Sequence, residues 1–548
     1  MIVNPGGLLA LSLAALLFSP KGPPFFDPDR SLDKQREAAK EAKEAARTQG
    51  PEVAQYLVDP SVQVRDDVFD VLVDRASPQL LEAFAGHLRG RDEFLAASVA
   101  ELYGACRYAA GRESLEKYGL RSRGELAALE AVWALEALGD PASAPALEKA
   151  FKRGHPGSEF RVRGDALIAL AAVAPSRARE LCGEALEHKL PPLRIAGIEA
   201  LRRIDRREAA RAAVSLIGAD ELPRRLGGWE ARILFAALDS LETWYERAAD
   251  AELMISAIDA LIARLGRADG LSRYRIALTL ADLTAQAPLG DDVESWQSWW
   301  GPRRDGFQAQ DKLPPEPKKE KKKKKKKADD ADEPEDAEDD GPPGRPLTGD
   351  AMKTRVRFHG IPIHSNRLLF AQDISGGMNN PVDRDDAASP TKLKFSNDEL
   401  KRVLGALDDD VMANIAFFAT EYEFTASSLL PVKKVRRQLI EFVGQKAVTP
   451  DGKAMGRSNL YDTLVTAFGD PQIDTVFFLS EGGPTEGRYL DPDRFMTHLQ
   501  RLNVYSRVQV HCLQVTTSSF GEKFLRRLAD ETGGRFYDLE FIKRAHGL

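Results

Sequence analysis

The chain has 548 residues, enough for two to four domains of roughly 100–200 residues each. Apolar residues make up 43% and charged residues 29%, which excludes a multi-span membrane protein and a wholly disordered chain. The 77 basic and 84 acidic residues leave a net charge of −7, so the overall charge gives no indication of nucleic-acid binding. Three scattered cysteines and eight scattered histidines exclude a disulfide framework and give no paired-histidine spacing for a catalytic zinc site.

An apolar run at residues 8–18 (LLALSLAALLF) dominates the N-terminus. A membrane-spanning helix needs roughly 20 apolar residues, whereas about eleven suit the hydrophobic region of a secretory signal. We therefore expect residues 1–20 to be a signal peptide or an N-terminal hydrophobic anchor, and the protein to be exported, periplasmic or membrane-tethered. No Lys or Arg precedes the run and Pro20 follows Ser19, so a cytoplasmic protein with a hydrophobic N-terminal helix or a misassigned start codon stays open.

The sequence pattern of residues 31–300 predicts paired helices separated by short stretches that contain Pro, Gly and Asp. Residues 125–139 show the pattern well, with apolar side chains at three- and four-residue intervals up to Asp140-Pro141. A short motif recurs around Arg65, Arg163, Arg194, Arg232 and Arg275: a Val or Leu, then the Arg, then small and aliphatic residues. We expect these arginines to cap helices or to pair with an Asp of the next repeat.

These recurring phrases resemble a HEAT-like α-solenoid. The resemblance implies a curved scaffold whose groove serves protein contacts. An irregular all-α bundle would give the same periodicity and stays an alternative. Trp296, Trp299 and Trp300 close the region, and we expect them to cover the last exposed helix face rather than to bind a partner.

Residues 301–350 predict a disordered linker. Residues 318–327 hold nine lysines and residues 329–340 nine carboxylates, with prolines on either side, so no packed core can form. We interpret the segment as a solvated spacer, because the acidic block competes for the lysines. The alternative is that the lysine block binds an anionic membrane or a nucleic acid.

Residues 351–548 switch to alternating strands and helices. A buried strand is expected at 367–374, a second at 412–419, a short one at 422–425 and a last one at 534–539. Near-continuous apolar runs at 475–479 and 508–515 indicate strands covered on both faces. Helices are expected at 398–407, 435–444, 459–468, 494–502 and 522–532. This order predicts a doubly wound, mostly parallel, Rossmann-like sheet. Cys512, in a buried strand, is interpreted as a core residue.

Three polar loops follow or flank these strands, around Asp373-Ile374-Ser375, Ser458 and Glu481. In this fold class polar sites gather outside the carboxyl ends of the strands, so the three loops should meet. With the phrases SNLYDTL and FFLSEGGPTEG, the region resembles a von Willebrand factor type A domain. The family's metal-ion-dependent adhesion site reads Asp-x-Ser-x-Ser, then a Thr, then an Asp. Asp373 and Ser375 match, Gly377 replaces the second serine, Ser458 replaces the threonine and Glu481 replaces the aspartate.

The resemblance implies a metal site formed by Asp373, Ser375, Ser458 and Glu481. Two carboxylates in one place are costly unless a cation or a proton lies between them, which favours Mg²⁺ or another divalent cation. The loss of a hydroxyl at Gly377 and the longer reach of Glu481 favour the alternative, a vestigial site without metal. In that case the Gly376-Gly377 pair is a tight turn and Ser458 is an N-cap.

The sequence therefore predicts a non-enzymatic interaction protein of several domains: an all-α HEAT-like solenoid followed by an α/β type A domain. We expect it to bind protein partners through the solenoid groove and the loop face of the type A domain. No small-molecule substrate and no nucleic acid are expected, and apart from the divalent ion no cofactor. The rival hypothesis is a hydrolase that uses Asp373, Ser375 and Glu481.

Overall fold

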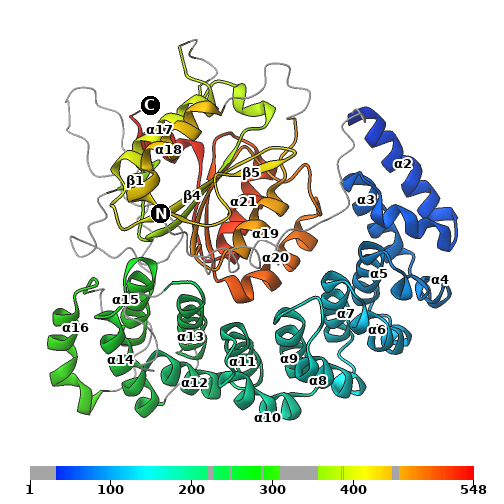
Figure 1. The fold of residues 1–548 in the computed structure, drawn as a ribbon, viewed down its shortest axis with the longest axis horizontal. Coiled ribbons are helices and arrows are strands. Elements are labelled where there is room, and N and C mark those ends of the chain that lie inside the picture. Colours follow the sequence, from blue (N-terminus) through cyan, green and yellow to red (C-terminus); the bar gives the residue numbers. More distant parts are fainter. Residues whose placement is uncertain are drawn as a thin grey trace, which may run out of the picture.

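A computed structural model describes residues 32–218, 227–245, 250–285, 289–307, 356–383, 386, 388–446 and 456–547. The expected N-terminal signal or anchor and most of the expected linker lie outside these residues. The described chain consists of a helical region up to residue 307, here called the arc, and an α/β domain from residue 356 (Figure 1). None of the helices within the described ranges combines the length and the apolarity that crossing a membrane requires.

The arc is a row of helices that curves around one side of the α/β domain (Figure 1). Its helices lie close to the predicted ones, and Gly139, at φ +66°, ends one of them before Asp140-Pro141 starts the next turn. The α-helices are α2 Leu32–Thr48, α3 Val62–Asp74, α4 Pro78–Phe84, α5 Glu93–Ala105, α6 Arg112–Lys117, α7 Glu125–Leu138, α8 Ala144–Arg153, α9 Arg161–Val173, α10 Pro175–Leu186, α11 Pro191–Ile204, α12 Arg206–Gly218, α13 Trp229–Tyr245, α14 Ala251–Leu265, α15 Gly270–Thr284 and α16 Val293–Trp300. The 3₁₀ turns are Pro51–Val58, His87–Arg89, Ala109–Gly111, Gly119–Arg121, Pro141–Ser143 and Gly301–Gly306.

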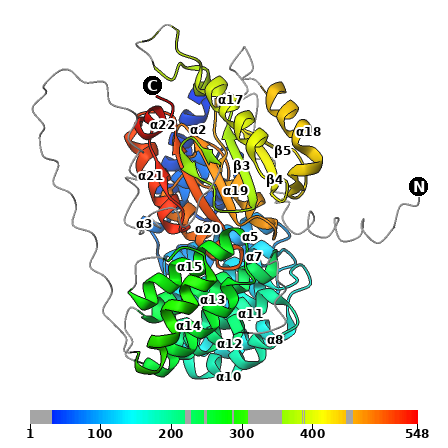
Figure 2. The same cartoon turned by 90° about the vertical axis from the view of Figure 1, so that its left-hand side faces the viewer.

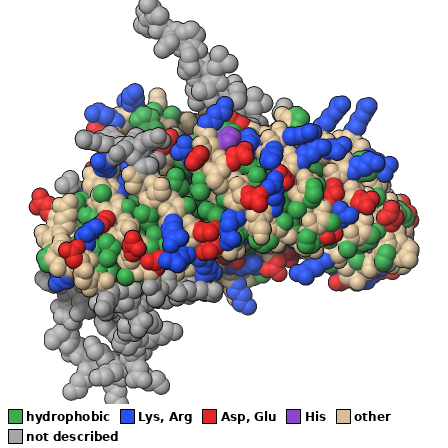
Figure 3. All heavy atoms as spheres, turned by 90° about the horizontal axis from the view of Figure 1, so that it is seen from below, with side chains coloured by type: hydrophobic (Ala, Val, Ile, Leu, Met, Phe, Trp, Pro, Cys, Tyr) green, Lys and Arg blue, Asp and Glu red, His purple; other side chains and the backbone are tan. Residues whose placement is uncertain are grey.

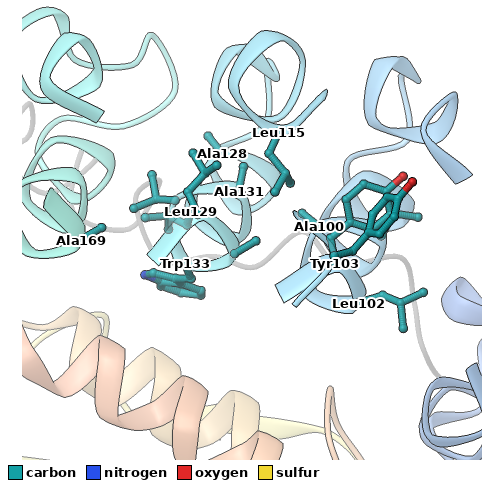
Figure 4. Close-up of a cluster of buried hydrophobic side chains, with 14 of the residues drawn as sticks. Ala100, Leu102, Tyr103, Leu115, Ala128, Leu129, Ala131, Trp133 and Ala169 are labelled. Carbon is teal, nitrogen blue, oxygen red and sulfur yellow. The ribbon is translucent and has the colours of Figure 1, made fainter. Parts of the chain in front are cut away.

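Two rows of helices build the arc. The inner row is α5, α7, α9, α11, α13 and α15, each packed on the next, and α8, α10, α12 and α14 cover it from outside. Between the rows small and aliphatic side chains fill the core, with Trp133 on the side that faces the α/β domain (Figure 4). Seen from below, acidic and basic side chains are intermixed on the surface of the arc (Figure 3).

The tryptophan cluster closes the arc, as expected. Trp296 is fully buried and its indole N–H donates to the Gly290 carbonyl at 2.9 Å. Trp300 donates to an oxygen of Asp259 on α14 at 2.7 Å. The two buried indoles therefore pack on the last helices of the row.

The α/β domain holds one main sheet with strand order β5-β4-β3-β7-β8-β9. Strands β3, β4, β7, β8 and β9 are parallel to their neighbours, while β5 and β6 run antiparallel to β4. The strands are β1 Arg357–Phe358, β2 Ile361–Pro362, β3 Arg367–Asp373, β4 Met412–Phe418, β5 Tyr422–Phe424, β6 Leu430–Pro431, β7 Thr475–Ser480, β8 Gln509–Gln514 and β9 Phe536–Tyr537. The short pair β1–β2 forms a separate hairpin.

Helices cover both faces of the sheet (Figure 2). Side chains alternate along β3: Leu368 and Phe370 join the core under α17, α18 and α22, while Leu369 and Ala371 join the core under α19, α20 and α21. The helices are α17 Lys392–Ala406, α18 Val432–Gln445, α19 Leu460–Gly469, α20 Pro492–Ser506, α21 Ser519–Glu531 and α22 Leu539–Ala545. The alternation confirms a sheet buried on both sides.

Some elements differ from the predicted ones. Helix α17 starts six residues earlier than expected, because Thr391 caps it by accepting a hydrogen bond from the Lys394 N–H at 3.2 Å. The hairpin β1–β2 and the C-terminal helix α22 were not expected. Both are short, and short elements carry little periodic signal.

Helix α20 lies between the sheet and the inner row of the arc (Figure 1). Its side chains Arg494, His498, Arg501 and Tyr505 follow one face at helical spacing and meet the arc. The arc contributes to this contact one acid from each of six helices. We call these acids the acidic ladder: Asp66 (α3), Glu101 (α5), Glu130 (α7), Asp165 (α9), Glu199 (α11) and Asp239 (α13).

Each acid of the ladder is paired with the α/β domain. Arg494 contacts Asp66 at 2.6 Å and Glu101 at 2.9 and 3.0 Å. The remaining pairs are Arg488 with Glu130 at 3.0 Å, the Tyr505 hydroxyl donating to Asp165 at 2.6 Å, and Arg507 with both Glu199 and Asp239. The face of the arc that was expected to hold partners is therefore lined by a helix of the same chain.

Two of the recurring arginines also contact the α/β domain. Arg65 donates to the carbonyls of Asp59 and of Gly487, both at 2.7 Å, and Arg232 donates to the Asp470 carbonyl at 2.8 Å. Arg163 and Arg194 donate to carbonyls within the arc, and Arg275 pairs with Asp239. Arg163 thus caps α8 as expected, whereas Arg194 donates to a carbonyl beyond the end of α10 and Arg275 pairs with an Asp of the preceding inner helix, not of the next repeat. Arg65 and Arg232 also join the two regions.

Candidate functional site

The carboxyl ends of the central strands point away from helices α13 and α15 of the arc. Contacts with α13 and α15 involve segments that precede strands, such as Asn366 before β3, whose amide donates to Asp269 at 3.3 Å, and Arg507 before β8. Because β3, β7 and β8 are parallel, their carboxyl ends lie together at the opposite edge. We call this edge the rim and define it as residues 373–378, 391–392, 456–459, 480–484 and 515–520.

The rim lies at the point where the strand order reverses. From β3 the chain first adds β4 on one side and later β7 on the other, so the crossovers diverge at the carboxyl end of β3. In doubly wound sheets this divergence leaves a crevice in which ligands bind. The sequence prediction that the three polar loops converge at one edge therefore matches the structure.

Asp373 is the buried centre of the rim. It has no exposed surface, and its oxygens accept hydrogen bonds from the Ser375 N–H at 2.7 Å, the Ser458 hydroxyl at 3.1 Å and the Ser480 hydroxyl at 2.9 Å. Burial raises the pKa of this carboxyl, while the hydrogen bonds from the three serines oppose the shift. The donors hold the carboxylate in one orientation.

Ser458 belongs to this network and does not cap a helix. The N-cap of α19 is Asn459, whose side-chain oxygen accepts from the Asp462 N–H at 3.1 Å. The Ser458 hydroxyl is therefore directed at Asp373, and its backbone N–H donates to the Thr485 hydroxyl at 2.7 Å. The N-cap interpretation of Ser458 is wrong by one residue.

Glu481 fills the space that the missing serine would need. A Cβ atom built on Gly377 would lie 1.5 Å from Oε2 of Glu481, so no side chain fits there while Glu481 keeps this position. The other oxygen of Glu481 accepts a hydrogen bond from the Lys392 ammonium at 2.5 Å. The Lys392 side chain is 4% exposed and that of Glu481 21%. Glycine at 377, glutamate at 481 and lysine at 392 thus form one fitted group.

The four predicted ligands fit a divalent ion poorly in this arrangement. Mg²⁺ requires about six oxygens in near-octahedral geometry. Gly377 offers no hydroxyl, and Glu481 would have to leave the Lys392 ammonium to become a ligand. The ammonium already supplies the positive charge that we expected beside Glu481 to offset two neighbouring carboxylates.

An exposed aromatic ring flanks this group. Phe520, the second residue of α21, is 57% exposed and is the one large hydrophobic side chain that is mostly exposed among the described residues. A Cβ atom on Gly483 would lie 2.7 Å from its ring, so the glycines after Glu481 let the loop approach α21 closely. The rim therefore combines a charged pair, serine hydroxyls and an apolar ring.

Three functional candidates at the rim were not identified in the sequence: Lys392, Ser480 and Phe520. Thr391 before KLKF was an available N-cap signal that would have placed Lys392 at the start of α17. Ser480 directly follows the predicted strand at 475–479, in the loop that was already singled out. Nothing in the sequence distinguishes Phe520 from a core residue.

A cavity lies at the opposite end of the domain. It has a volume of about 710 Å³ and separates α11, α13 and α15 from α20 and Gln509. Its lining is charged, but Glu199, Asp239, Arg275 and Arg507 already pair with one another across it. The groups that form the cavity are thus used in holding the two regions together.

Comparisons with known proteins are sparse. No family model and no curated protein matches the chain. Among solved structures, similarity is found to a von Willebrand factor type A protein from Catenulispora acidiphila, with 16% identity over 32% of this chain and 41% of that one, at a TM-score of 0.26. The PilB minor pilin from Streptococcus sanguinis gives 11% identity, 33% and 59% coverage and a TM-score of 0.25.

A third similarity concerns the complex of CpcE and CpcF of phycocyanin lyase from a Nostoc species. Identity is 18% over 42% of this chain and 94% of that chain, with a TM-score of 0.27. The chain covers less than two thirds of the first two structures. At these identities and TM-scores the comparisons assign no family and no activity to the chain.

Proposed function

We propose that this chain is a non-enzymatic interaction protein that binds a protein partner at the rim. Its α/β domain is proposed to be a type A domain of the von Willebrand factor kind, and its arc a HEAT-like scaffold that holds this domain. The observation that carries the proposal is the composition of the rim: the solvent-exposed Phe520 lies on the same loop edge as the Lys392–Glu481 pair. An apolar anchor beside a partly buried charged pair is typical of a protein-binding surface.

The Lys392 ammonium is proposed to take the place of the divalent ion. It stays fixed to Glu481 and can offer its remaining hydrogens to an acidic or carbonyl group of the partner. Binding is then independent of Mg²⁺. Magnesium binding by Asp373, Ser375, Ser458 and Glu481 is the alternative that the same experiment tests.

The hydrolase hypothesis finds less support at the rim. Asp373 accepts hydrogen bonds from three donors, and Glu481 is paired with Lys392, so neither carboxylate is placed to activate a water molecule. Export or membrane tethering stays part of the proposal, with a cytoplasmic location as the alternative. The lysine-block alternative predicts salt-dependent binding that disappears when residues 318–327 are deleted.

A site-specific photo-crosslinker at position 520 tests the proposal in the host cell. The matched control carries the same crosslinker at position 437, on α18 of the same domain, where the Arg437 side chain is 91% exposed. We expect a discrete adduct from position 520 alone. Equal adducts at both positions, or none at position 520, would contradict a binding role of the rim.

The identified partner is then purified and its affinity measured by calorimetry in Mg²⁺ and in chelator. We expect equal affinities in both buffers and a loss of affinity in Lys392→Met. Affinity that requires Mg²⁺ and disappears in Asp373→Ala would establish the metal site instead. Turnover of ester, phosphoester or peptide substrates that Glu481→Gln abolishes would establish the hydrolase.

A further inference from the structure

Two histidines and a glutamate remote in sequence meet on the face of the sheet that α17 and α22 cover. His359 lies in the turn of the β1–β2 hairpin, Glu399 on α17, and His546 directly after α22. One potential ligand atom from each of the three lies within 4.8 Å of the other two. The three side chains therefore form a compact set of donors that no part of the rim uses.

The two imidazoles face each other with their ring nitrogens. Nδ1 of His359 lies 3.1 Å from Nε2 of His546. Two neutral imidazoles at this distance share a single proton, or both direct lone pairs at one cation. In a tetrahedral zinc site with Zn–N bonds of about 2.05 Å, two ligand nitrogens are about 3.3 Å apart. The observed separation is close to that value.

Glu399 is held in place for the same position. One of its oxygens accepts from the His359 N–H at 2.7 Å and from Arg402 at 2.8 Å, and the other accepts from Arg402 at 2.6 Å. This second oxygen keeps a lone pair for a ligand. Carboxylates that bind metal are commonly oriented by such outer hydrogen bonds.

The surroundings of His359 point to a ligand rather than to a simple polar contact. The residue has no exposed surface and lies against the rings of Phe358 and Phe395. Its Nε2 atom has no hydrogen-bond partner among the described residues. Placing an imidazole in an aromatic pocket is costly unless a strong bond at the other nitrogen compensates, and a metal–nitrogen bond does so.

We propose that His359, Glu399 and His546 bind a zinc ion. Two imidazoles and one carboxylate suit zinc, since Mg²⁺ and Ca²⁺ prefer oxygen ligands alone. His546 is half-buried, so a water molecule can reach the fourth position. The ion would fasten the β1–β2 hairpin and the C-terminal helix α22 to α17. This site is independent of the function proposed for the rim.

The test uses the full chain, purified without a metal-affinity tag and stripped with chelator. Titration with ZnCl₂, followed by calorimetry and thermal unfolding, is expected to show one saturable site and a higher melting temperature, whereas MgCl₂ has no such effect. His546→Ala should lower the zinc affinity by more than about tenfold. The control His87→Ala, whose histidine lies in the arc, should leave it unchanged.

His359 is buried and its replacement can prevent folding, so a second measurement supports the result. Hydrogen exchange of residues 357–362 and 539–545 should slow on zinc addition in the wild type and not in His546→Ala. No zinc uptake by the wild type would show that the histidine pair is a hydrogen bond and would overturn the proposal. Unchanged affinity in His546→Ala would do the same.

Discussion

The face of the α/β domain that meets the arc and the rim of the same domain differ in what their side chains contact. On the face that meets the arc, each acid of the acidic ladder meets a basic or hydroxyl group of the other region, and the pairs are largely buried. At the rim the Lys392–Glu481 pair is buried to a similar extent, with side chains 4% and 21% exposed, but the Phe520 ring beside it is 57% exposed.

This difference separates what holds the molecule together from what is available for binding. Buried pairs are costly to break, because the partner left behind is an uncompensated charge. At the rim the exposed Phe520 ring is instead available to pack against another protein. The following changes test this contrast, from the largest expected effect to the smallest.

Replacing Arg494 by alanine breaks the contact between the regions at its most connected point. Asp66 and Glu101 would lose a buried cation, and we expect about 3–5 kcal/mol of lost stability in urea unfolding. Arg527→Ala, which removes surface pairs with the 83% exposed Asp493 and with Glu531 one turn along α21, is the control and should cost under about 1 kcal/mol. Equal losses in both variants would mean that the interface pairs are no stronger than surface pairs.

Asp474, at the start of β7 on the side of the arc, should make stability depend on pH. Burial raises its pKa from 3.8 to about 6, although Ser365 and Thr475 donate to it at 2.5 and 2.9 Å. The folded state therefore binds the proton more tightly than the unfolded state, and stability declines as the pH rises from about 4 to 6. The decline attributable to this group is about 3 kcal/mol.

The measurement is the difference in unfolding free energy between the wild type and Asp474→Asn across this pH range. Asparagine keeps an oxygen for the two hydroxyl donors and has no proton to lose. The unfolding free energy of the variant, relative to that of the wild type, should increase as the pH rises. Parallel curves would show that Asp474 titrates normally in the folded protein.

Gly377→Ser introduces the second serine of the Asp-x-Ser-x-Ser pattern and should destabilise the rim. The new Cβ would fall on the Glu481 side chain, and we expect a cost of about 1–3 kcal/mol in thermal or urea unfolding. In a Glu481→Ala background the cost should largely disappear, because the obstacle is gone. An unchanged cost in that background would place the strain elsewhere.

Phe520→Ser should leave stability within about 0.5 kcal/mol of the wild type, since the ring is largely exposed. Partner affinity should nevertheless fall by about 30-fold or more, as for a central residue of an interface. Arg437→Ser, on α18, is the matched surface control and should change neither quantity. Full affinity of Phe520→Ser would exclude the ring from the interface.

The sequence predicted the larger features because each rests on a local pattern. The strands at 412–418 and 475–480 and the convergence of Asp373, Ser458 and Glu481 follow from apolar runs and from the geometry of parallel sheets. The packing of α20 against the arc depends on pairs such as Asp165–Tyr505, 340 residues apart, and no local pattern connects them. The same holds for His359 and His546, separated by 187 residues.

The rim shows a second reason for the limits of prediction. Glu481 was judged against the aspartate that the family uses, and its length argued only for a weaker site. Its actual effect depends on Lys392 and Gly377, which fit it only together. The residue at any one of these three positions does not reveal how the other two fit around it.

The spacing of contact residues along helix α20 also matches the spacing between helices of the arc. Arg494 meets Glu101 on α5, and Tyr505 meets Asp165 on α9, eleven positions further along α20. Eleven residues of α-helix rise about 16.5 Å, and two successive helix-to-helix steps of 8–10 Å give about 16–20 Å. The spacing of the scaffold is thus matched to a single helix laid across it, and a homologue that lengthened this stretch of α20 by one turn would have to bend differently to keep the same contacts.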